Sequence, residues 1–337
     1  MIISAKKFFS RLILLSCFLA VPFLCFYISS HYSVKTSVQT DPVTVVIKSG
    51  TSSYDIANQL ADAGVIQHPW LFFAGYWLTG SKKPLIAGEY SFNQSESCWE
   101  VLQHIQAGRV VIRKLTVPEG WTVGQVMVAL QQIDCLTGQI TKEPPEGSLL
   151  PDTYLYVYGD SRQEIINRMM MAMSQQLKQL WAQRQSDNLN VQTPEAAVVL
   201  ASIVEKETGI PEERARIAGV FLNRLRLGMP LQSDPTVIYA LTLGKKPLDR
   251  SLTRGDLSIN SVYNTYKING LPPHPIACPG IQALKAVLNP VLSRDLYFVA
   301  NGTGGHSFSE TLEQHNHYVS KWRQFNRQII NANAKKS

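Results

Sequence analysis

The residues best suited to do chemistry lie just past the middle of the chain, in the segment TPEAAVVLASIVEKETG at positions 193–209. This segment predicts a helix, because Thr193 can serve as its N-cap and Gly209 suits its end. Its apolar residues recur at helical spacing and form one stripe made of Ala196, Leu200, Ile203 and Val204. Glu207 continues this stripe, whereas Glu205 lies on another face. We therefore expect Glu207 to point inward and Glu205 to point to water.

A carboxylate at the end of a buried stripe is costly to leave ionised unless a cation pairs with it. Burial favours the protonated form, and a carboxyl group that holds its proton can act as a general acid. Glu207 is therefore a candidate general acid. The alternative is that Glu207 forms a structural ion pair with a neighbouring helix.

Side chains that suit sugars follow this helix. Asn223 and Arg224 lie near the end of a second predicted helix, and Gln232 and Asp234 lie in the turn before a third. The segment SVYNTYKINGLPPHPI at 261–276 predicts an ordered loop, because it is rich in Tyr, Asn, Gly and Pro. Amides, hydroxyls and aromatic faces suit neutral, hydroxyl-rich ligands.

Other chemistries are not indicated. The sequence holds no HExxH, no paired CxxC and no GxSxG, and it lacks a phosphate-binding Gly-rich loop. No ligand set accompanies the histidines near the C-terminus: His306, His315 and His317. We therefore expect neither a metal nor a cofactor. The cysteines beyond the N-terminal apolar run are odd in number and predict no disulfide framework: Cys98, Cys135 and Cys278.

Composition bounds the class of protein. The chain has 337 residues, of which 45% are hydrophobic and 17% charged, which is ample for a core and suggests about two domains. The formal net charge is +7, but the Lys and Arg residues are scattered and no nucleic-acid signature accompanies them. We expect no nucleic-acid partner. An anionic cell envelope fits the basic balance.

The N-terminus predicts the compartment. Basic residues within positions 1–11 precede an uncharged run at 12–30, which is long enough to span a bilayer. This charge asymmetry places residues 1–11 in the cytoplasm and the rest outside, on a single-pass anchor in the inner (plasma) membrane. A cleaved signal peptide is the competing interpretation, which Ser29 and Ser30 leave open. We favour the uncleaved anchor, because no clear small-x-small site follows the run.

After a polar linker at 31–42, residues 43–112 contain strand–turn–helix units. The first has a strand at 43–47 and a helix that ends at Gly64, and the second has Tyr90–Phe92 followed by the helical CWEVLQHIQAG. A third unit follows at 110–133, so we expect small modules built alike. The first resembles a LysM-like peptidoglycan-binding module; a structural spacer is the alternative.

The remainder, residues 113–333, is predicted to be mostly helical, and the whole chain to be α+β. A loop at 144–154 precedes a long helix that opens with the capping box Ser161-x-x-Glu164. We interpret the methionines of this helix as core packing: Met169–Met171 and Met173. Further helices are predicted at 193–209, 211–227 and 279–288 and from Leu312 onward, with a strand at 296–300.

Several of these motifs together resemble the YceG/MltG family of endolytic murein transglycosylases. They are the run from Leu200 to Thr208 and the later FLNRL, LQSDPTVIY, YNTY, GLPPHPI and GGHSF. The resemblance covers the apolar run, the LysM-like part and nearly all of the remainder. Shorter likenesses to the wider lytic transglycosylases accompany it: Glu207-Thr208 resembles their catalytic Glu-Ser, Gln232 resembles a loop Gln, and Tyr263-Asn264 resembles their Tyr-Asn. His274 and Cys278 depart from the family pattern.

The resemblance implies cleavage of the β-1,4 bond between N-acetylmuramic acid and N-acetylglucosamine without water, which leaves a 1,6-anhydro end. Glu207 would be the acid and then the base. Gln232, Tyr263 and Asn264 would contact sugar, while Asn223 and Tyr266 would either line the cleft or support it.

Two charged residues keep alternative roles. Arg224 would hold a substrate carboxylate or brace a helix end. Asp234 is a second acid or, as we favour, a turn cap before Pro235. His306, beside two glycines, is expected to be a turn residue.

The implied partners are peptidoglycan glycan strands and peptidoglycan synthase complexes. The first rival function is a membrane-anchored, non-enzymatic peptidoglycan-binding scaffold in which Glu207 is structural. The second is a conventional hydrolase, which would admit water and give reducing ends.

Overall fold

The computed structural model describes residues 24, 41–78, 83–93, 95–185 and 191–334, with the backbone alone at 329–334. The chain forms two compact units: residues up to Arg113 together with Tyr156–Gly159, and the remainder. Apart from Leu24, the predicted anchor at 12–30 lies outside the described residues. Among the helices that are described, none has the length and hydrophobicity needed to cross a membrane.

The N-terminal unit is a two-stranded antiparallel sheet covered by helices. Its elements are β1 (Val43–Ile47), α2 (Ser53–Asp62), α3 (Pro69–Leu78), β2 (Gly88–Phe92) and α4 (Cys98–Gln106). Val45 lies opposite Tyr90 in the β1–β2 ladder. Ser97 and Glu100 form a capping box at the start of α4. The core beneath the sheet includes Ile47, Leu60, Phe72, Tyr90, Phe92 and Leu102.

This pairing corrects the expectation of three modules built alike. The strands of the first two strand–turn–helix units pair with each other and so form one module. The strand of the third unit, β3 (Arg113–Thr116), pairs with β4 (Thr153–Tyr156) instead. A lone strand leaves its backbone groups unpaired, so each strand needs a partner from elsewhere in the chain.

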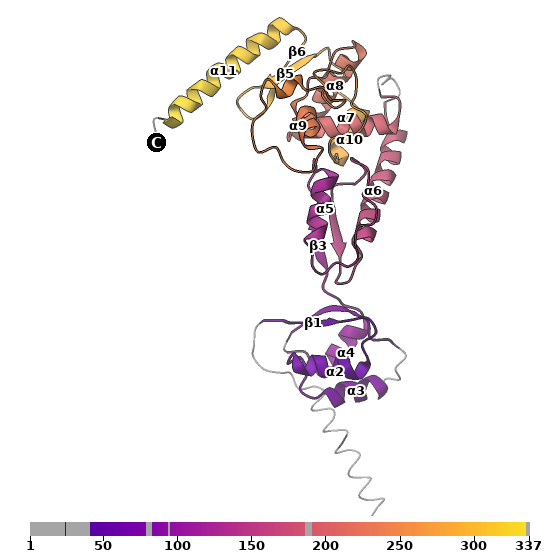
Figure 1. The fold of residues 1–337 in the computed structure, drawn as a ribbon. Coiled ribbons are helices and arrows are strands. Elements are labelled where there is room, and N and C mark those ends of the chain that lie inside the picture. The colour runs from indigo at the N-terminus through magenta and orange to yellow at the C-terminus, as the bar shows by residue number, and fades with distance from the viewer. Residues whose placement is uncertain (1–23, 25–40, 79–82, 94, 186–190, 335–337) are drawn as a thin grey trace, which may run out of the picture. The chain divides into compact units, whose positions relative to one another are not determined.

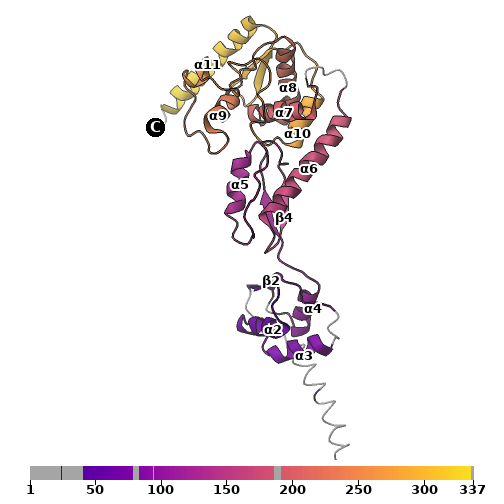
Figure 2. The ribbon, with the colours of Figure 1, turned by 45° about the vertical axis from the view of Figure 1, so that its right-hand side comes forward.

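The β3–β4 ribbon lies between two helices, α5 (Val123–Gln131) and α6 (Arg162–Ala182) (Figures 1 and 2). The predicted capping box at the start of α6 is wrong, because Ser161 makes no side-chain capping bond. Instead, Arg162 anchors the helix start by donating to backbone carbonyls, among them that of Ile133 at 2.7 Å.

The methionine prediction for α6 holds for part of the set. Met169 and Met173 are buried, but Met171 is 65% exposed. The buried face is narrower than the methionine run, because successive helix residues point in different directions.

A helical core forms the centre of the second unit. Its helices are α7 (Pro194–Glu207), α8 (Pro211–Arg226), α9 (Asp234–Thr242), the 3₁₀ helix η1 (Asp256–Ser258) and α10 (Ile281–Leu288). Helix α10 packs on both α7 and α8 (Figures 1 and 2). A hairpin of β5 (Tyr297–Ala300) and β6 (His306–Ser309) follows, and α11 (Leu312–Ala334) ends the fold.

Helix α7 is central and has no broad solvent face. Thr193 caps it by accepting from the Ala196 N–H at 3.1 Å. Every residue from Ala197 to Val204 is buried, where the sequence pattern predicted one apolar stripe. The helix ends at Glu207 because Thr208 is extended, which places the end two residues before Gly209.

Candidate active site

Glu207 is the last residue of α7, and its side chain is half-buried. The Ser233 hydroxyl donates to Oε1 of Glu207 at 2.5 Å. Burial raises the pKa of Glu207 above its ordinary value, and the nearby charge of Asp234 adds to this rise. The Ser233 bond and the positive charges of His306 and Arg224 act in the opposite direction. The net result is a carboxyl group that holds its proton more firmly than an exposed Glu.

Ser233 is a residue that the sequence analysis missed. It is 1% exposed and precedes α9, where a serine would ordinarily cap the helix, but its hydroxyl makes no capping bond. The hydroxyl is directed to Glu207 instead. The signal was the Ser-Asp-Pro run, which indicates a helix start and conceals the second role.

The YNTY loop holds Ser233 in place through Thr265. The Ser233 N–H donates to Oγ1 of Thr265 at 3.0 Å, and the Gln232 N–H donates to the Thr265 carbonyl at 3.1 Å. Gln232 has a φ of 52°, in the left-handed region that non-glycine residues rarely adopt, and its side chain is exposed. Such strained positions cluster at functional sites.

Asn264 and Tyr266 occupy different parts of this loop. Asn264 is fully buried, and its amide donates to the carbonyls of Leu257 at 3.1 Å and Ile259 at 2.8 Å. Its own side-chain oxygen accepts from the Tyr266 N–H at 3.0 Å. The Tyr266 hydroxyl donates to Oδ1 of Asp234 at 2.6 Å. Asn264 therefore braces the loop, while Tyr266 and Asp234 pair at its surface.

The predicted short helix is confirmed, but Asp234 is its first residue and Ser233 holds the N-cap position, so the favoured role of Asp234 as a turn cap before the helix is wrong. Tyr263 lies against Tyr239, with ring centroids 4.9 Å apart and planes inclined by 59°. Tyr263 is half-buried.

Arg224 and Asn223 fasten α8 to neighbouring loops. Arg224 is 8% exposed, and its guanidinium donates to the carbonyls of Leu296 at 2.7 Å and Leu231 at 2.8 Å. Asn223 donates to the carbonyl of Ser293 at 2.9 Å, among other bonds. Burial lowers the pKa of Arg224. The positive charge of Arg224 nonetheless favours the ionised form of Glu207.

The expectation of a solvated Glu205 is wrong. Its side chain is 4% exposed and accepts from Arg214 at 3.1 Å and from the Gly280 N–H at 2.9 Å. Arg214 also bonds Glu119, at 3.2 Å. The sequence pattern predicted that one face of this helix would be exposed to solvent. The prediction failed for Glu205 because α8 and α10 pack against α7. Glu205 and Glu207 nevertheless bind different partners, as residues two apart on a helix must.

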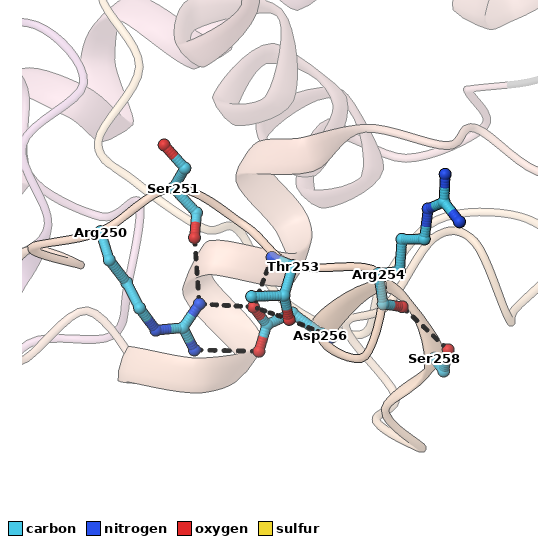
Figure 3. Close-up of polar contacts among 6 residues, drawn as sticks. All are labelled: Arg250, Ser251, Thr253, Arg254, Asp256 and Ser258. Carbon is cyan, nitrogen blue, oxygen red and sulfur yellow. Dashed lines mark hydrogen bonds and ion pairs between the residues drawn. The ribbon is translucent and has the colours of Figure 1, made fainter.

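A second ion pair fixes the loop that precedes Asn264. Figure 3 shows a bidentate ion pair, in which Nη1 and Nη2 of Arg250 both donate to the Asp256 carboxylate. The bond from Nη2 to Oδ1 is 3.0 Å long, and the Thr253 N–H donates to Oδ2 of the same carboxylate at 2.7 Å. The Arg250 bond, followed by those from Thr253, holds the pKa of Asp256 well below its usual range. Asp256 is the first residue of η1. The two carbonyls that accept from Asn264 belong to Leu257, within η1, and Ile259, just after it.

His306 was expected to be a turn residue, but it begins β6 and bonds Glu213 on α8. Its N–H donates to Oε1 of Glu213 at 2.8 Å, and its Nδ1 lies 2.6 Å from Oε2. Within the described ranges no cluster of three or more His, Cys, Asp or Glu residues could hold a metal ion. Cys98, Cys135 and Cys278 are free thiols.

Glu207 is therefore a carboxyl group with a raised pKa, bonded by Ser233 next to the YNTY loop, and the comparisons identify the class. The chain belongs to the YceG-like family, whose model matches residues 45–321. This confirms the family that the sequence motifs resemble.

Two named relatives are similar over most of the chain. The endolytic murein transglycosylase of Bacillus subtilis is 31% identical, over 86% of this chain and 88% of that protein. The endolytic murein transglycosylase of Streptococcus pneumoniae is also 31% identical, over 83% of this chain. The chain spans 58% of the length of that pneumococcal protein.

A solved structure is similar as well. The 2.6 Å crystal structure of a YceG-like protein from Listeria monocytogenes is 33% identical. The match covers 83% of this chain and 99% of that one, with a TM-score of 0.51.

Proposed function

We propose that this chain is an endolytic murein transglycosylase that cleaves the bond between N-acetylmuramic acid and N-acetylglucosamine and leaves a 1,6-anhydro end. The observation that carries the proposal is the half-buried Glu207 carboxyl group, which accepts from Ser233 and has a raised pKa, next to the YNTY loop that holds Ser233. The names of the relatives support the same activity.

Glu207 would serve both halves of the reaction. The protonated carboxyl group gives its proton to the glycosidic oxygen as the C1–O bond breaks. The C6 hydroxyl of the same sugar then attacks C1 and returns a proton to Glu207. One bond breaks, one bond forms and no water is consumed. Ordinary glycosidases need a second carboxylate to act as nucleophile or to activate water.

The surface of the loop offers the sugar contacts. We assign Gln232, Tyr263 and Tyr266 to contact with the glycan, because Gln232 is exposed and the two tyrosines are half-buried in the neighbouring loop. We assign Asn223, Arg224 and Asn264 to support of the cleft, because their bonds go to protein carbonyls. Asp234 acts on both the contact residues and the acid, since it accepts from the Tyr266 hydroxyl and its charge raises the pKa of Glu207.

The proposed substrate contacts can be tested by substitution. Gln232→Ala and Tyr266→Phe should raise KM for soluble glycan strands, because each removes a polar group that a sugar hydroxyl can bind. The control is an exposed amide on another element, Gln314→Ala on α11, which should leave KM unchanged. Equal KM values for all three variants would refute the assignment.

We further propose that residues 43–112 bind glycan as a LysM-like module and that residues 12–30 tether the chain, with the active unit outside the cytoplasm. Exposed aromatic side chains on α2 and α3 support glycan contact, because aromatic faces suit sugars: Tyr54, Trp70 and Trp77. Deleting residues 43–109 should weaken sedimentation with peptidoglycan while the type of product end stays the same. A changed product end would refute this division.

The test of the activity is mass spectrometry of peptidoglycan digested by the purified protein. Anhydro-ended fragments support a transglycosylase, and reducing ends would indicate a hydrolase. Binding with no release of fragments would indicate the scaffold.

A further inference from the structure

A pocket of about 380 Å³ lies beside the N-terminal half of α7. Helix α6 and the loops at 145–148 and 273–275 complete its lining, and all of these segments belong to the second unit. None of the residues assigned above to the acid, the sugar contacts or their support lines it. Its volume falls within the range of pockets that bind small ligands, roughly 300–1,000 Å³.

The wall of this pocket is aliphatic. Met173, Val198 and Val199 are buried, and Met170 and Leu177 are half-buried. The lining contains no Phe, Tyr or Trp, so it lacks the flat aromatic faces that suit sugar rings. The wall therefore suits an aliphatic chain, whose contact with it removes apolar surface from water.

Apart from His274 at the rim, the ionisable side chains of the lining are two carboxyl groups, with no Lys or Arg. Glu195 is exposed in the first turn of α7, and Glu146 is half-buried. Burial raises the pKa of Glu146, while backbone N–H groups and hydrogen bonds from Tyr239 and Cys278 act in the opposite direction, and no cation is among these groups. An ionised Glu146 therefore has no counter-ion within the described residues, and a cationic ligand would supply one.

The Glu146 carboxyl group is held in place by bonds from other elements. The Val123 N–H at the start of α5 donates to Oε1 at 2.9 Å, and the Tyr239 hydroxyl on α9 donates to Oε2 at 3.4 Å. Gly147 follows with a φ of 76°, and a Cβ there would lie 2.6 Å from Pro275. Glycine at this position lets the two loops meet, so Glu146 is fixed at the wall before a ligand arrives.

Two helices connect this pocket to Glu207. Helix α7 carries Val199 at the pocket and Glu207 at its last position, about 12 Å further along the helix axis at 1.5 Å per residue. Helix α9 follows Ser233, which donates to Glu207, and carries Tyr239, which donates to Glu146. A peptide of three extended residues spans roughly 10 Å, which is close to this separation.

We propose that this pocket binds the aliphatic ammonium side chain of the diamino acid in the peptide that a peptidoglycan strand carries. The inference rests on the proposed function and narrows its substrate. The sugars of the strand are neutral, and carboxylates of the peptide would meet Glu146 and Glu195 with like charge. The diamino acid is the third residue from the sugar, and its chain ends in a cation that matches both the aliphatic wall and the two acids. Glu146 and Glu195 determine specificity without touching the reacting atoms.

The first experiment measures binding by the full chain with isothermal titration calorimetry. The ligands are a disaccharide-tripeptide that ends in N-acetylmuramic acid, with its side-chain amine free, and the same fragment acetylated at that amine. Neither fragment contains the bond proposed to be cleaved, so binding is measured without turnover. Acetylation removes the charge, and we expect it to raise Kd for the wild type roughly tenfold or more.

Glu146→Gln should bind both fragments alike, because Gln keeps the size of Glu but has no charge to pair with the ammonium. The two fragments carry the same sugars, so any displacement of Tyr239 affects them equally. Glu143→Gln is the matched control, since Glu143 is exposed shortly before the 145–148 loop and does not line the pocket. This variant should keep the wild-type ratio of the two Kd values.

Ser174→Lys is a second variant, at an exposed position where α6 lines the pocket. A positive charge at the rim should raise KM for strands whose peptides carry the free amine, with kcat nearly unchanged. Ser174→Gln is its uncharged control and should have little effect on KM. Circular dichroism checks the fold of each variant.

Equal Kd values of the two fragments for the wild type, or no binding of the free-amine fragment, would overturn the inference. A wild-type ratio in folded Glu146→Gln would overturn it as well. If Glu146→Gln fails to fold, an unchanged KM of Ser174→Lys for the free-amine strands would do so instead. A ratio that is lost in Glu146→Gln, beside a wild type that releases no anhydro ends from any strand, would overturn the proposed function and support the pocket.

Discussion

Replacing Glu205 by Gln should destabilise the second unit without a change in side-chain size. The carboxylate is 4% exposed and accepts from two donors, Arg214 and the Gly280 N–H. Gln offers one acceptor oxygen, so one donor loses its partner, and the ion pair loses its charge. Removing one member of a buried pair costs roughly 3–5 kcal/mol.

Two features of the structure reduce this cost. Burial raises the pKa of Glu205, which shows that its ionised form already bears a desolvation cost that Gln avoids. Arg214 also keeps its bond to Glu119. We therefore expect a loss of about 2–3 kcal/mol in the free energy of unfolding. For a unit of this size the loss lowers Tm by roughly 4–12 °C.

Glu119→Gln is the matched control. It removes the other carboxylate from the same Arg214, but Glu119 is 40% exposed. Pairs of this kind contribute about 1 kcal/mol or less. Chemical unfolding followed by circular dichroism measures both variants. Equal stabilities for Glu205→Gln and Glu119→Gln would refute the claim that burial of Glu205 makes its ion pair the important one.

Three other predictions concern packing, thiol reactivity and pH. Gly219→Ala would ordinarily stabilise a helix by about 1 kcal/mol. Here it should lower Tm, because the new Cβ would lie 2.6 Å from the Val291 carbonyl oxygen. Burial raises the pKa of Cys278 to about 12, so a thiol reagent should label it only after unfolding, whereas half-buried Cys135 should react in the native protein. Folding raises the pKa of Glu207, so its ionisation opposes folding as the pH rises above the unfolded-state pKa. Glu207→Gln should therefore match the wild-type Tm at acidic pH and exceed it at alkaline pH, and a lower Tm there would contradict this sign.

Local patterns predicted the elements well. The strand at Val43–Ile47 is confirmed residue for residue, and the helix expected at 211–227 is observed at Pro211–Arg226. Start signals such as Thr193 act within one turn, so the sequence contains all the information they need. The β5 strand is likewise observed at Tyr297–Ala300, within the predicted segment.

Long-range contacts could not be predicted in the same way. Glu205 is buried because it binds Arg214 on α8 and the N–H of Gly280, the residue before α10. Gly280 lies 75 residues further along the chain, so a local pattern could not predict this contact. Ser233 meets Glu207 across 26 residues, and its helix-start pattern concealed this contact. His306 was expected in a turn because its partner, Glu213, is 93 residues away.

The most direct test of the proposed activity is the release of anhydro-ended fragments by Glu207→Gln, measured by mass spectrometry on purified peptidoglycan. Gln keeps the size of Glu and can still accept from Ser233, but it has no proton to transfer. General acid–base steps contribute roughly 10²–10⁴-fold, so nearly all release should be lost while the variant stays folded and still binds glycan. Release at the wild-type rate by folded Glu207→Gln would contradict the assignment of Glu207 as acid and base.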